Sequence, residues 1–231
     1  MLSLKLNHVD AAPLRLICLG AHCDDIEIGC GGTILELAES ARKLEVYWLV
    51  FSSDERRKLE AQRCAELFLS NATIREIKVL SFRDGFLPYH GVEVKEAFEQ
   101  LKENLSPDLI LTHYRHDLHQ DHRLISDLTW NTFRDHLILE YEIPKYDGDF
   151  GAPNFFVPLD QSVCQRKIDT ILSEFPSQQG KRWFCRDLFS SVLRLRGMEA
   201  NAASGYAEGF YCRKANLKLD STGLFYVNPA S

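Results

Sequence analysis

Two short segments of the sequence concentrate the residue types that hold metal ions and transfer protons. Residues 21–25 read AHCDD, so that His22 stands three positions before Asp25 and close to a second aspartate, Asp24. Adjacent carboxylates repel each other, which costs stability unless a cation lies nearby. A metal ion held by His22 and Asp25 is the simplest explanation. A second segment, residues 112–122 (THYRHDLHQDH), supplies further histidines and aspartates.

The second segment offers several candidates for a third ligand. They are His116, Asp117, His119, Asp121 and His122. Two imidazoles and one carboxylate, with the remaining positions left to water, are typical of a catalytic zinc site. Zinc would lower the pKa of its bound water to about 7 and polarise a carbonyl oxygen. A neighbouring carboxylate would act as general base and a histidine held by an aspartate as general acid. Asp24, and His119 with Asp121, fit these roles.

Each segment also has a structural interpretation. An aspartate between a strand and a helix often caps the helix. The sequence GCGG at residues 29–32 predicts only a tight turn, because the GxGxxG spacing of a phosphate-binding loop is absent. Three histidines and two aspartates within residues 116–122 are harder to explain structurally, since without a task they would merely charge a surface. Together the two segments favour a metal site.

The elements that must position these segments alternate between apolar and amphipathic runs, as in a mostly parallel sheet with crossover helices. The predicted strands are residues 14–20, 45–51, 76–82 and 107–113. The predicted helices are residues 31–43, 53–68 with Ser53 as N-cap, 92–105 and 121–137. The polar segments follow the first and fourth strands, and ligands bind at the carboxyl ends of strands in open parallel sheets. Crossover topology can place these two strands side by side, in which case the segments share one cleft.

The pattern changes after residue 141. Residues 141–158 are rich in Pro, Gly and aromatic residues and predict a long ordered loop with a short strand. Two helices at residues 160–175 and 186–198 and a closing strand at residues 206–214 complete the chain. Because no repeat or long linker interrupts it, we expect a single domain over residues 1–231.

Composition limits the class of partner. The net charge of -6 argues against binding a nucleic-acid backbone, which requires clustered Lys and Arg. The seven cysteines form no CxxC pair and are expected to be free thiols in a reducing compartment. No apolar run approaches the ~20 residues of a membrane span, and the N-terminus lacks a signal peptide's apolar core. We therefore expect a soluble cytoplasmic protein that acts on a small molecule.

At these two segments the sequence resembles the LmbE-like, or PIG-L, family of zinc-dependent N-acetylglucosaminyl deacetylases. The first motif of that family, roughly AHPDDEexGcGG, is AHCDDIEIGCGG here at residues 21–32. The second motif ends in HxDH and is HQDH here at residues 119–122. Weaker similarities extend the resemblance over most of the chain; they lie at Arg57 and Glu60, residues 82–87 and residues 206–210.

The resemblance implies a fold, a metal and a reaction. The implied fold is a Rossmann-like three-layer α/β sandwich with a mostly parallel sheet. One zinc ion per chain would be held by His22, Asp25 and His122. Asp24 would be the general base; His119 would protonate the departing amine and stabilise the tetrahedral oxyanion, with Asp121 orienting it. The implied reaction removes an N-acetyl group from an amino sugar or amino-sugar conjugate. Family members often assemble, so a homo-oligomer is an open expectation.

Two positions depart from the family motif. Cys23 replaces a proline and would loosen the turn, either as a packing substitution or as a thiol that competes for the metal. Ile26 replaces a glutamate and removes a charge beside the ligands. Two other functions stay open. An Fe(II)-dependent oxygenase uses the same set of two histidines and one carboxylate, and a catalytically degenerate member of the family would bind a sugar without turnover.

Several other residues are not assigned a single role by the sequence. Arg57 either pairs with Glu60 on its own helix or grips the substrate. The aromatic residues between 146 and 156 either stack on a sugar ring or pack in the core. Glu208 is expected to be structural. His113, His116 and Asp117 either line the cleft or cap its loop.

Overall fold

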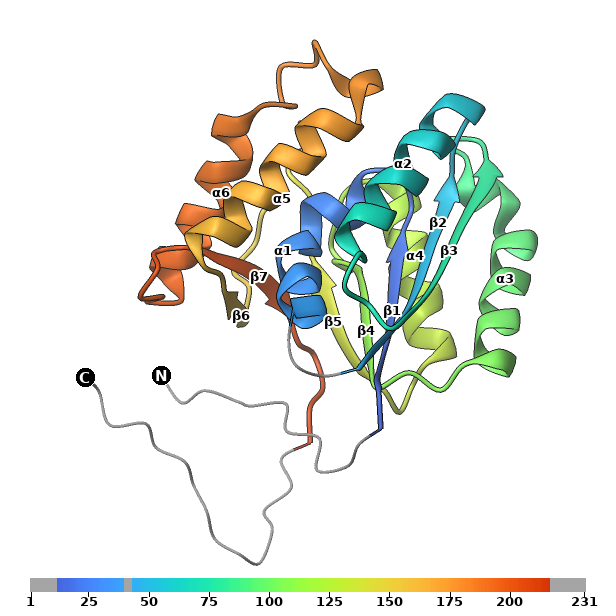
Figure 1. Ribbon diagram of the computed structural model, residues 1–231. Helices are drawn as coiled ribbons and strands as arrows, with labels where there is room; N and C mark the ends of the chain where they lie inside the picture. The colour runs from blue at the N-terminus through green and yellow to red at the C-terminus, as the bar shows by residue number, and fades with distance from the viewer. Residues whose placement is uncertain (1–11, 40–42, 217–231) are drawn as a thin grey trace, which may run out of the picture.

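A seven-stranded sheet forms the centre of the computed structural model, which describes residues 12–39 and 43–216 (Figure 1). The strand order is β3-β2-β1-β4-β5-β7-β6. Strands β1 to β5 are parallel to one another, and β7 is antiparallel to both β5 and β6. The strands are β1 (Leu14–Gly20), β2 (Leu44–Ser52), β3 (Ile74–Phe82), β4 (Leu109–His113), β5 (Leu137–Tyr141), β6 (Phe155–Pro158) and β7 (Ala207–Tyr211).

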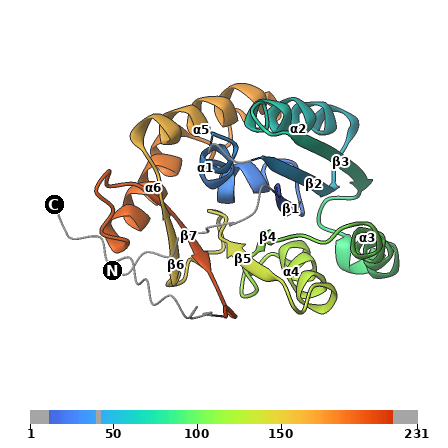
Figure 2. The same ribbon diagram turned by 60° about the horizontal axis from the view of Figure 1, so that its bottom comes forward.

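Helices cover both faces of the sheet, which makes the three layers visible in Figure 2. One face carries α1 (Asp25–Glu39), α2 (Glu55–Phe68), α5 (Gln161–Glu174) and α6 (Arg186–Glu199). The other carries α3 (Gly91–Asn104) and α4 (Gln120–Thr132). Two short 3-10 helices are η1 (Leu87–His90) and η2 (Pro176–Gln178). The predicted three-layer α/β sandwich with a mostly parallel sheet is confirmed.

The two faces of the sheet have separate hydrophobic cores. Along β1, Leu16 and Cys18 pack in the core beneath α1 and α2, whereas Ile17 and Leu19 pack in the core beneath α3 and α4. A strand that is buried on both faces has to be apolar throughout rather than alternating. This explains the continuous apolar run by which β1 could be predicted.

The start of α1 differs from the prediction. The helix begins at Asp25 and not at Gly31, so GCGG lies at a break inside α1, at Cys30, and not in a tight turn that precedes the helix as predicted. None of Gly29, Gly31 and Gly32 has a positive φ. A Cβ atom on Gly29 would lie 2.1 Å from the Tyr141 ring, so this glycine is required by close packing. Residues 40–42 of the predicted helix lie outside the described residues.

Two other boundaries also need correction. The N-cap of α2 is Asp54, whose side chain accepts the N–H of Arg57 at 2.8 Å, while the Ser53 hydroxyl donates to the Leu80 carbonyl. The helix predicted to reach residue 137 ends at Thr132. After a turn, residues 137–141 form β5, a strand that was not predicted because its apolar residues continue the helical pattern of α4.

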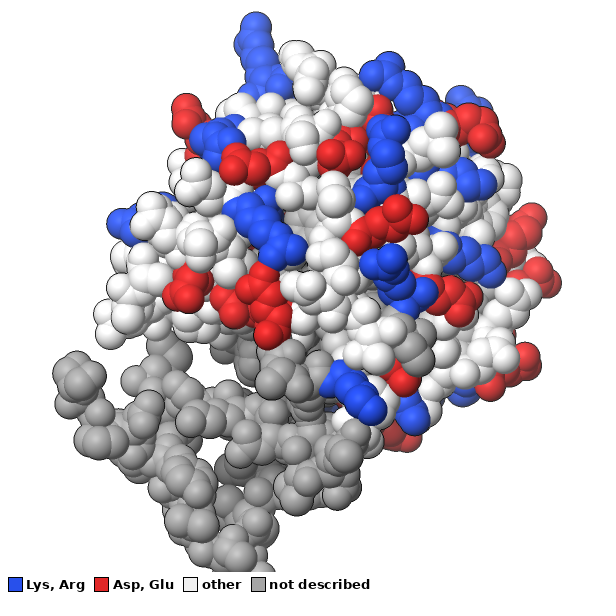
Figure 3. All heavy atoms as spheres, viewed as in Figure 1, with Lys and Arg blue, Asp and Glu red and all other residues white. Residues whose placement is uncertain are grey.

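The surface, the helices and the cysteines give three further observations. Acidic and basic side chains are intermixed on the face shown in Figure 3, unlike the continuous basic surface that binds a phosphate backbone. Among the residues that the structure describes, no helix is both long enough and apolar enough to cross a membrane. All seven cysteines are free.

Candidate active site

The pairing of β1 with β4 brings the two polar segments together. Cys18 lies opposite Leu111 in this parallel pair, so both strands end at the same edge of the sheet. The N–H of Ala21, directly after β1, donates to His113 Nε2 at the end of β4 at 2.9 Å. The predicted convergence of the two segments therefore occurs, and the register of two buried strands fixes it.

Three side chains meet at distances suited to a metal ion. Asp25 Oδ2 lies 3.2 Å from His22 Nδ1 and 3.4 Å from His122 Nε2. The two nitrogens, His22 Nδ1 and His122 Nε2, are 3.0 Å apart. Ligands on a tetrahedral zinc ion with bonds of about 2.0–2.2 Å are about 3.3–3.6 Å from one another. All three residues are buried. Their donor atoms and spacing thus fit a divalent cation.

Carboxylates hold the outer nitrogens of both histidines. His22 Nε2 lies 3.2 Å from Asp84 Oδ1 and 3.3 Å from Asp121 Oδ2, and His122 Nδ1 lies 2.9 Å from Asp117 Oδ2. Such contacts fix the ring orientation and leave the inner nitrogen free for a metal. The role of Asp117 could not be assigned from the sequence, and Asp84 was not among the predicted site residues.

The charges in this cluster shift the pKa values of its members. Burial alone would lower the pKa of His22 and of His122, but the Asp25 carboxylate and the outer carboxylates raise both. Burial would raise the pKa of Asp25, but the three histidines His122, His22 and His113 lower it well below its usual range. An ionised Asp25 is the form required of a metal ligand.

Other nearby groups of potential ligands overlap with this one. Within each group, the ligand atoms lie within 4.8 Å of one another. The groups are His22 with His119 and His122, Asp25 with His113 and His122, and His22 with Asp84 and Asp121. His113 Nε2 already accepts the Ala21 N–H, which makes it a poorer ligand. Burial and the charge of His122 lower the pKa of His113 to about 4, so it is neutral at pH 7. Because His113 ends β4, its presence in the site could have been predicted from the rule that ligands bind at the carboxyl ends of strands.

Asp24 lies beside the ligands and is held by an arginine. Arg57 donates to Asp24 Oδ1 through Nη2 and to Asp84 Oδ2 through Nη1, both at 3.1 Å. Burial and the neighbouring Asp25 raise the pKa of Asp24, while Arg57 opposes the rise. The alternative pairing of Arg57 with Glu60 is wrong, because Glu60 contacts Arg56 instead.

His119 and Asp121 begin α4. His119 is the N-cap, and its Nδ1 accepts the backbone N–H of Asp121 at 3.2 Å, which leaves the proton of the neutral ring on Nε2. Burial and the charges of His122 and His22 lower the pKa of His119. The Asp121 carboxylate was predicted to orient His119. It instead accepts the N–H groups of Gly85 and Leu87 and faces His22.

The two departures from the motif lie away from the ligand atoms. The Cys23 thiol is buried and donates to the Ser52 carbonyl, and burial raises its pKa. Ile26 is buried in the core beneath α1 and α2. His116 is exposed and is not among the residues that line the cleft.

The site opens into a cleft of about 190 Å³. One wall carries the residues described above. We call the part of the lining that follows β5 in the chain the opposite wall. It comes from the segment after β5, from η2 and from the segment after η2, and its residues are Ile143, Pro144, Lys145, Tyr146, Gln178, Lys181 and Trp183. Of the predicted aromatic stretch, Tyr146 lines the cleft, whereas Phe155 packs against the core from β6.

A sequence comparison agrees with this geometry. The sequence model of the PIG-L family, GlcNAc-PI de-N-acetylase, matches residues 17–133, just over half of the chain. The chain belongs to the PIG-L family. The matched region runs from β1 to the residue after α4, so it contains both polar segments of the site.

Individual relatives share the fold and differ in chemistry. A diacetylchitobiose deacetylase of Thermococcus kodakarensis is 27% identical over 90% of this PIG-L chain and 86% of its own. The structure of an N,N'-diacetylchitobiose deacetylase of Pyrococcus horikoshii with its inhibitor MPG has a TM-score of 0.62 at 20% identity, covering 85% of this chain and 82% of that one. GalB, a 4-carboxy-2-hydroxymuconate hydratase of Pseudomonas putida, has a TM-score of 0.65 at 15% identity, covering 90% and 99%. The reaction therefore has to be argued from the site.

Proposed function

We propose that this protein is a zinc-dependent hydrolase that removes an N-acetyl group from an amino sugar or an amino-sugar conjugate. The observation that carries the proposal is the convergence of His22, Asp25 and His122 at ligand distances, beside the buried carboxylate of Asp24. Membership of the PIG-L family and similarity to a diacetylchitobiose deacetylase support an N-acetylated amino sugar as substrate. The seven free cysteines support the cytoplasm as its compartment.

Amide hydrolysis requires a base for the attacking water and stabilisation of the oxyanion. A zinc ion held by His22, Asp25 and His122 would supply a Lewis acid that lowers the pKa of water and polarises the amide carbonyl. Asp24 accepts the proton of the attacking water. Burial raises its pKa and strengthens it as a base, while Arg57 keeps the carboxylate ionised and oriented.

The amine is a poor leaving group until it is protonated. His119 donates a hydrogen bond from Nε2 to the developing oxyanion, since its Nδ1 is occupied by the N–H of Asp121. To act as the acid, His119 takes a proton from solvent on Nδ1 in place of the Asp121 N–H contact, and the imidazolium gives its Nε2 proton to the amine nitrogen as the C–N bond breaks. The lowered pKa makes this imidazolium a stronger acid. The proton that Asp24 took from water is released to solvent with the products.

The opposite wall suits a sugar ring. Tyr146 and Trp183 offer aromatic faces on which the C–H face of a pyranose packs. Lys181 lies on the same wall, where its ammonium group donates to Gln178 Oε1 at 2.6 Å and offers further donors for sugar hydroxyls. The cleft therefore combines a polar reaction centre with an amphipathic surface for the ring.

The test compares two histidines of the same segment. Purified wild type, His122→Ala and His116→Ala are analysed for metal content without added metal, and for amine release from N-acetylglucosamine, diacetylchitobiose and N-acetylglucosaminides with neutral or acidic aglycones. We expect about one zinc per chain in the wild type and in His116→Ala, whose exposed side chain lies outside the cleft lining. His122→Ala should lose the zinc and at least ~10³-fold in kcat/KM, because the metal contributes several kcal/mol of transition-state stabilisation.

Three results would overturn the proposal. Predominant iron with oxygen-dependent turnover would identify an oxygenase. Zinc and sugar binding without release of amine from any of these substrates would identify a degenerate binding protein. Absence of metal from the wild type would remove the basis of the mechanism.

A further inference from the structure

Helix α1 is broken one turn after it begins. Cys30 has a φ of -143° and a ψ of 15°, outside the helical region, so residues 25–29 and 31–39 are two helical pieces in one element. A break leaves carbonyl groups at the end of the first piece and N–H groups at the start of the second without partners inside the helix. Ile28 and Gly32 are buried, so water cannot readily satisfy these groups.

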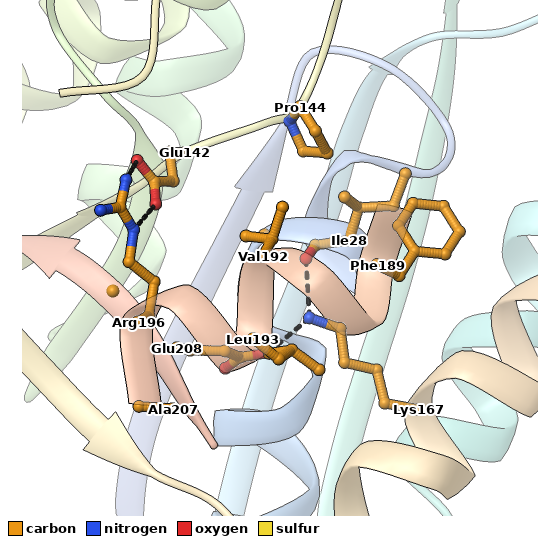
Figure 4. Close-up of a pocket in the computed structure, with 12 residues that line it drawn as sticks. Ile28, Glu142, Pro144, Lys167, Phe189, Val192, Leu193, Arg196, Ala207 and Glu208 are labelled. Atoms are coloured by element: carbon orange, nitrogen blue, oxygen red, sulfur yellow. Dashed lines mark hydrogen bonds and ion pairs between the residues drawn. The ribbon is translucent and has the colours of Figure 1, made fainter. Parts of the chain in front are cut away.

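A buried ion pair supplies the missing partners from outside the helix (Figure 4). Glu208 of β7 accepts the N–H groups of Gly32 and Thr33, both at 2.7 Å, and the Thr33 hydroxyl at 2.6 Å. Lys167 of α5 donates to the Ile28 carbonyl at 2.7 Å and to Glu208 at 2.6 Å. Two side chains thus cap both sides of the break and bind each other.

The charges of this pair match the polarity of the two helical pieces. A carboxylate at a helix N-terminus and an ammonium group at a helix C-terminus are both favourable. Gly32 makes the approach possible, because a Cβ atom there would lie 2.9 Å from Glu208 Oε1 and 2.4 Å from Leu159 Cδ1. Gly32, the last glycine of GCGG, therefore leaves room for the capping carboxylate.

The first helical piece carries part of the candidate active site. It begins at Asp25, and the Asp24 carbonyl accepts the Ile28 N–H at 3.1 Å. At one end, Asp25 Oδ2 accepts the His22 backbone N–H at 2.6 Å. At the other end, Lys167 holds Ile28, which also lines the cleft. The piece is thus fixed from both ends.

We propose that Lys167 and Glu208 are positioning residues for the active site. By capping both sides of the break they hold the first turn of α1, and with it Asp24 and Asp25, in the orientation that a metal and its base require. A buried ion pair contributes little net stability compared with apolar residues of similar volume, so defined geometry is the gain to expect from this one. The catalytic part of this inference rests on the proposed function; the capping part rests on the contacts alone.

A second buried ion pair in the same region provides a matched control (Figure 4). Arg196 of α6 donates to Glu142 through Nε at 2.6 Å and through Nη2 at 2.8 Å. The other polar contacts of this pair go to Glu199, Gly151 and Tyr211, which lie outside α1. Removing it should affect folding stability without releasing the first turn of α1.

The experiment compares the double variants Lys167→Met/Glu208→Gln and Glu142→Gln/Arg196→Met, each of which removes a whole pair and leaves no buried charge unpaired. Four quantities are measured: the Tm, amide hydrogen exchange over residues 25–33, affinity for zinc alone by chelator competition, and kcat and KM for amine release. We expect the first variant to exchange the Gly32 and Thr33 amides at least about tenfold faster than the control variant. We also expect it to bind zinc about tenfold or more weakly and to lose kcat with little change in KM.

The possible outcomes separate the two proposals. Equal exchange rates and zinc affinities in the two double variants would overturn the positioning role. Faster exchange in a protein whose wild type neither binds zinc nor releases amine would support the capping and overturn the proposed function. If the Lys167→Met/Glu208→Gln protein does not fold, Thr33→Val removes one hydrogen bond of Glu208 and should give smaller shifts in the same direction. Wild-type exchange and zinc affinity in Thr33→Val would then count against the proposal.

Discussion

The two walls of the candidate cleft are built on different principles. The wall that comes from the sheet carries Asp24, Asp25 and His122, which are 5%, 4% and 2% exposed. Arg57 holds Asp24, the His22 N–H holds Asp25, and Asp117 holds His122.

The opposite wall comes from connecting segments, and Tyr146 on it is 81% exposed. Ile143 and Gln178 on that wall are buried. One wall is thus fixed by the fold, while the other combines buried residues with exposed ones that are free to adapt.

This difference separates chemistry from recognition. Groups that bind a metal and transfer protons need fixed positions, which buried hydrogen-bonded side chains provide. Groups that contact the rest of a substrate can change with little disturbance to the sheet, since they lie on connections at the surface. We therefore expect substitutions in the first wall to act on kcat and metal binding, and substitutions in the second to act on KM.

Lys145 connects the two walls. It belongs to the segment after β5, yet its ammonium group donates to Asp117 at 2.8 Å and contacts Asp149 at 2.5 Å. Asp117 in turn holds His122. This chain of contacts makes Lys145 the place where the contrast between the walls is tested most directly.

The largest effect is expected for Asp24→Asn. The amide cannot accept a proton from water, so kcat should fall by about 10²–10⁴-fold, the usual contribution of general base catalysis. Metal content should stay at the wild-type level, because Asp24 is assigned as base and not as ligand. Steady-state kinetics together with elemental analysis check both. Loss of the metal in this variant would show that Asp24 belongs to the ligand set and that the proposed assignment is wrong.

The sequence predicted the fixed wall better than the adaptable one. The apolar runs of β1 and β4 and the dense His and Asp segments behind them are local features, and the strand order brings them together. The start of α1 could not be predicted in this way. Glycine disfavours helix, and the contact of Gly29 with Tyr141 that overrides this preference is made by a distant strand.

The partners around the ligands also depend on tertiary contacts. Asp84 reaches His22 because the segment after β3 packs on α4, where Gly85 donates to Asp121. No spacing in the sequence records that contact. The opposite wall was harder still, because its residues come from two segments separated by α5, one of which follows the unpredicted strand β5. Aromatic content alone indicated Tyr146 without indicating Trp183.

An intermediate effect is expected for Lys145→Met. Asp117 would keep His122 but lose its cationic partner, so the histidine is held less firmly and zinc should bind about tenfold more weakly. Chelator competition with zinc alone measures this. Tyr146→Ala alters the adjacent, exposed residue and should leave zinc affinity unchanged. Equal zinc affinities in Lys145→Met and the wild type would mean that the two walls are independent of each other.

The smallest effect is expected for Trp183→Leu on the adaptable wall. Replacing an aromatic face by an aliphatic side chain should remove about 1 kcal/mol of contact with the sugar ring, which raises KM by about fivefold and leaves kcat unchanged. Metal content should also stay the same, because the ring contacts of Trp183 are to Lys181 and Phe184 and not to a ligand. Kinetics with one N-acetylated substrate at saturating and subsaturating concentrations measure the two constants separately. Trp130→Leu is the matched control, since Trp130 packs against Arg213 outside the cleft lining and should change neither constant. A fall in kcat for Trp183→Leu would instead mean that this wall stabilises the transition state. The two walls would then not separate chemistry from recognition.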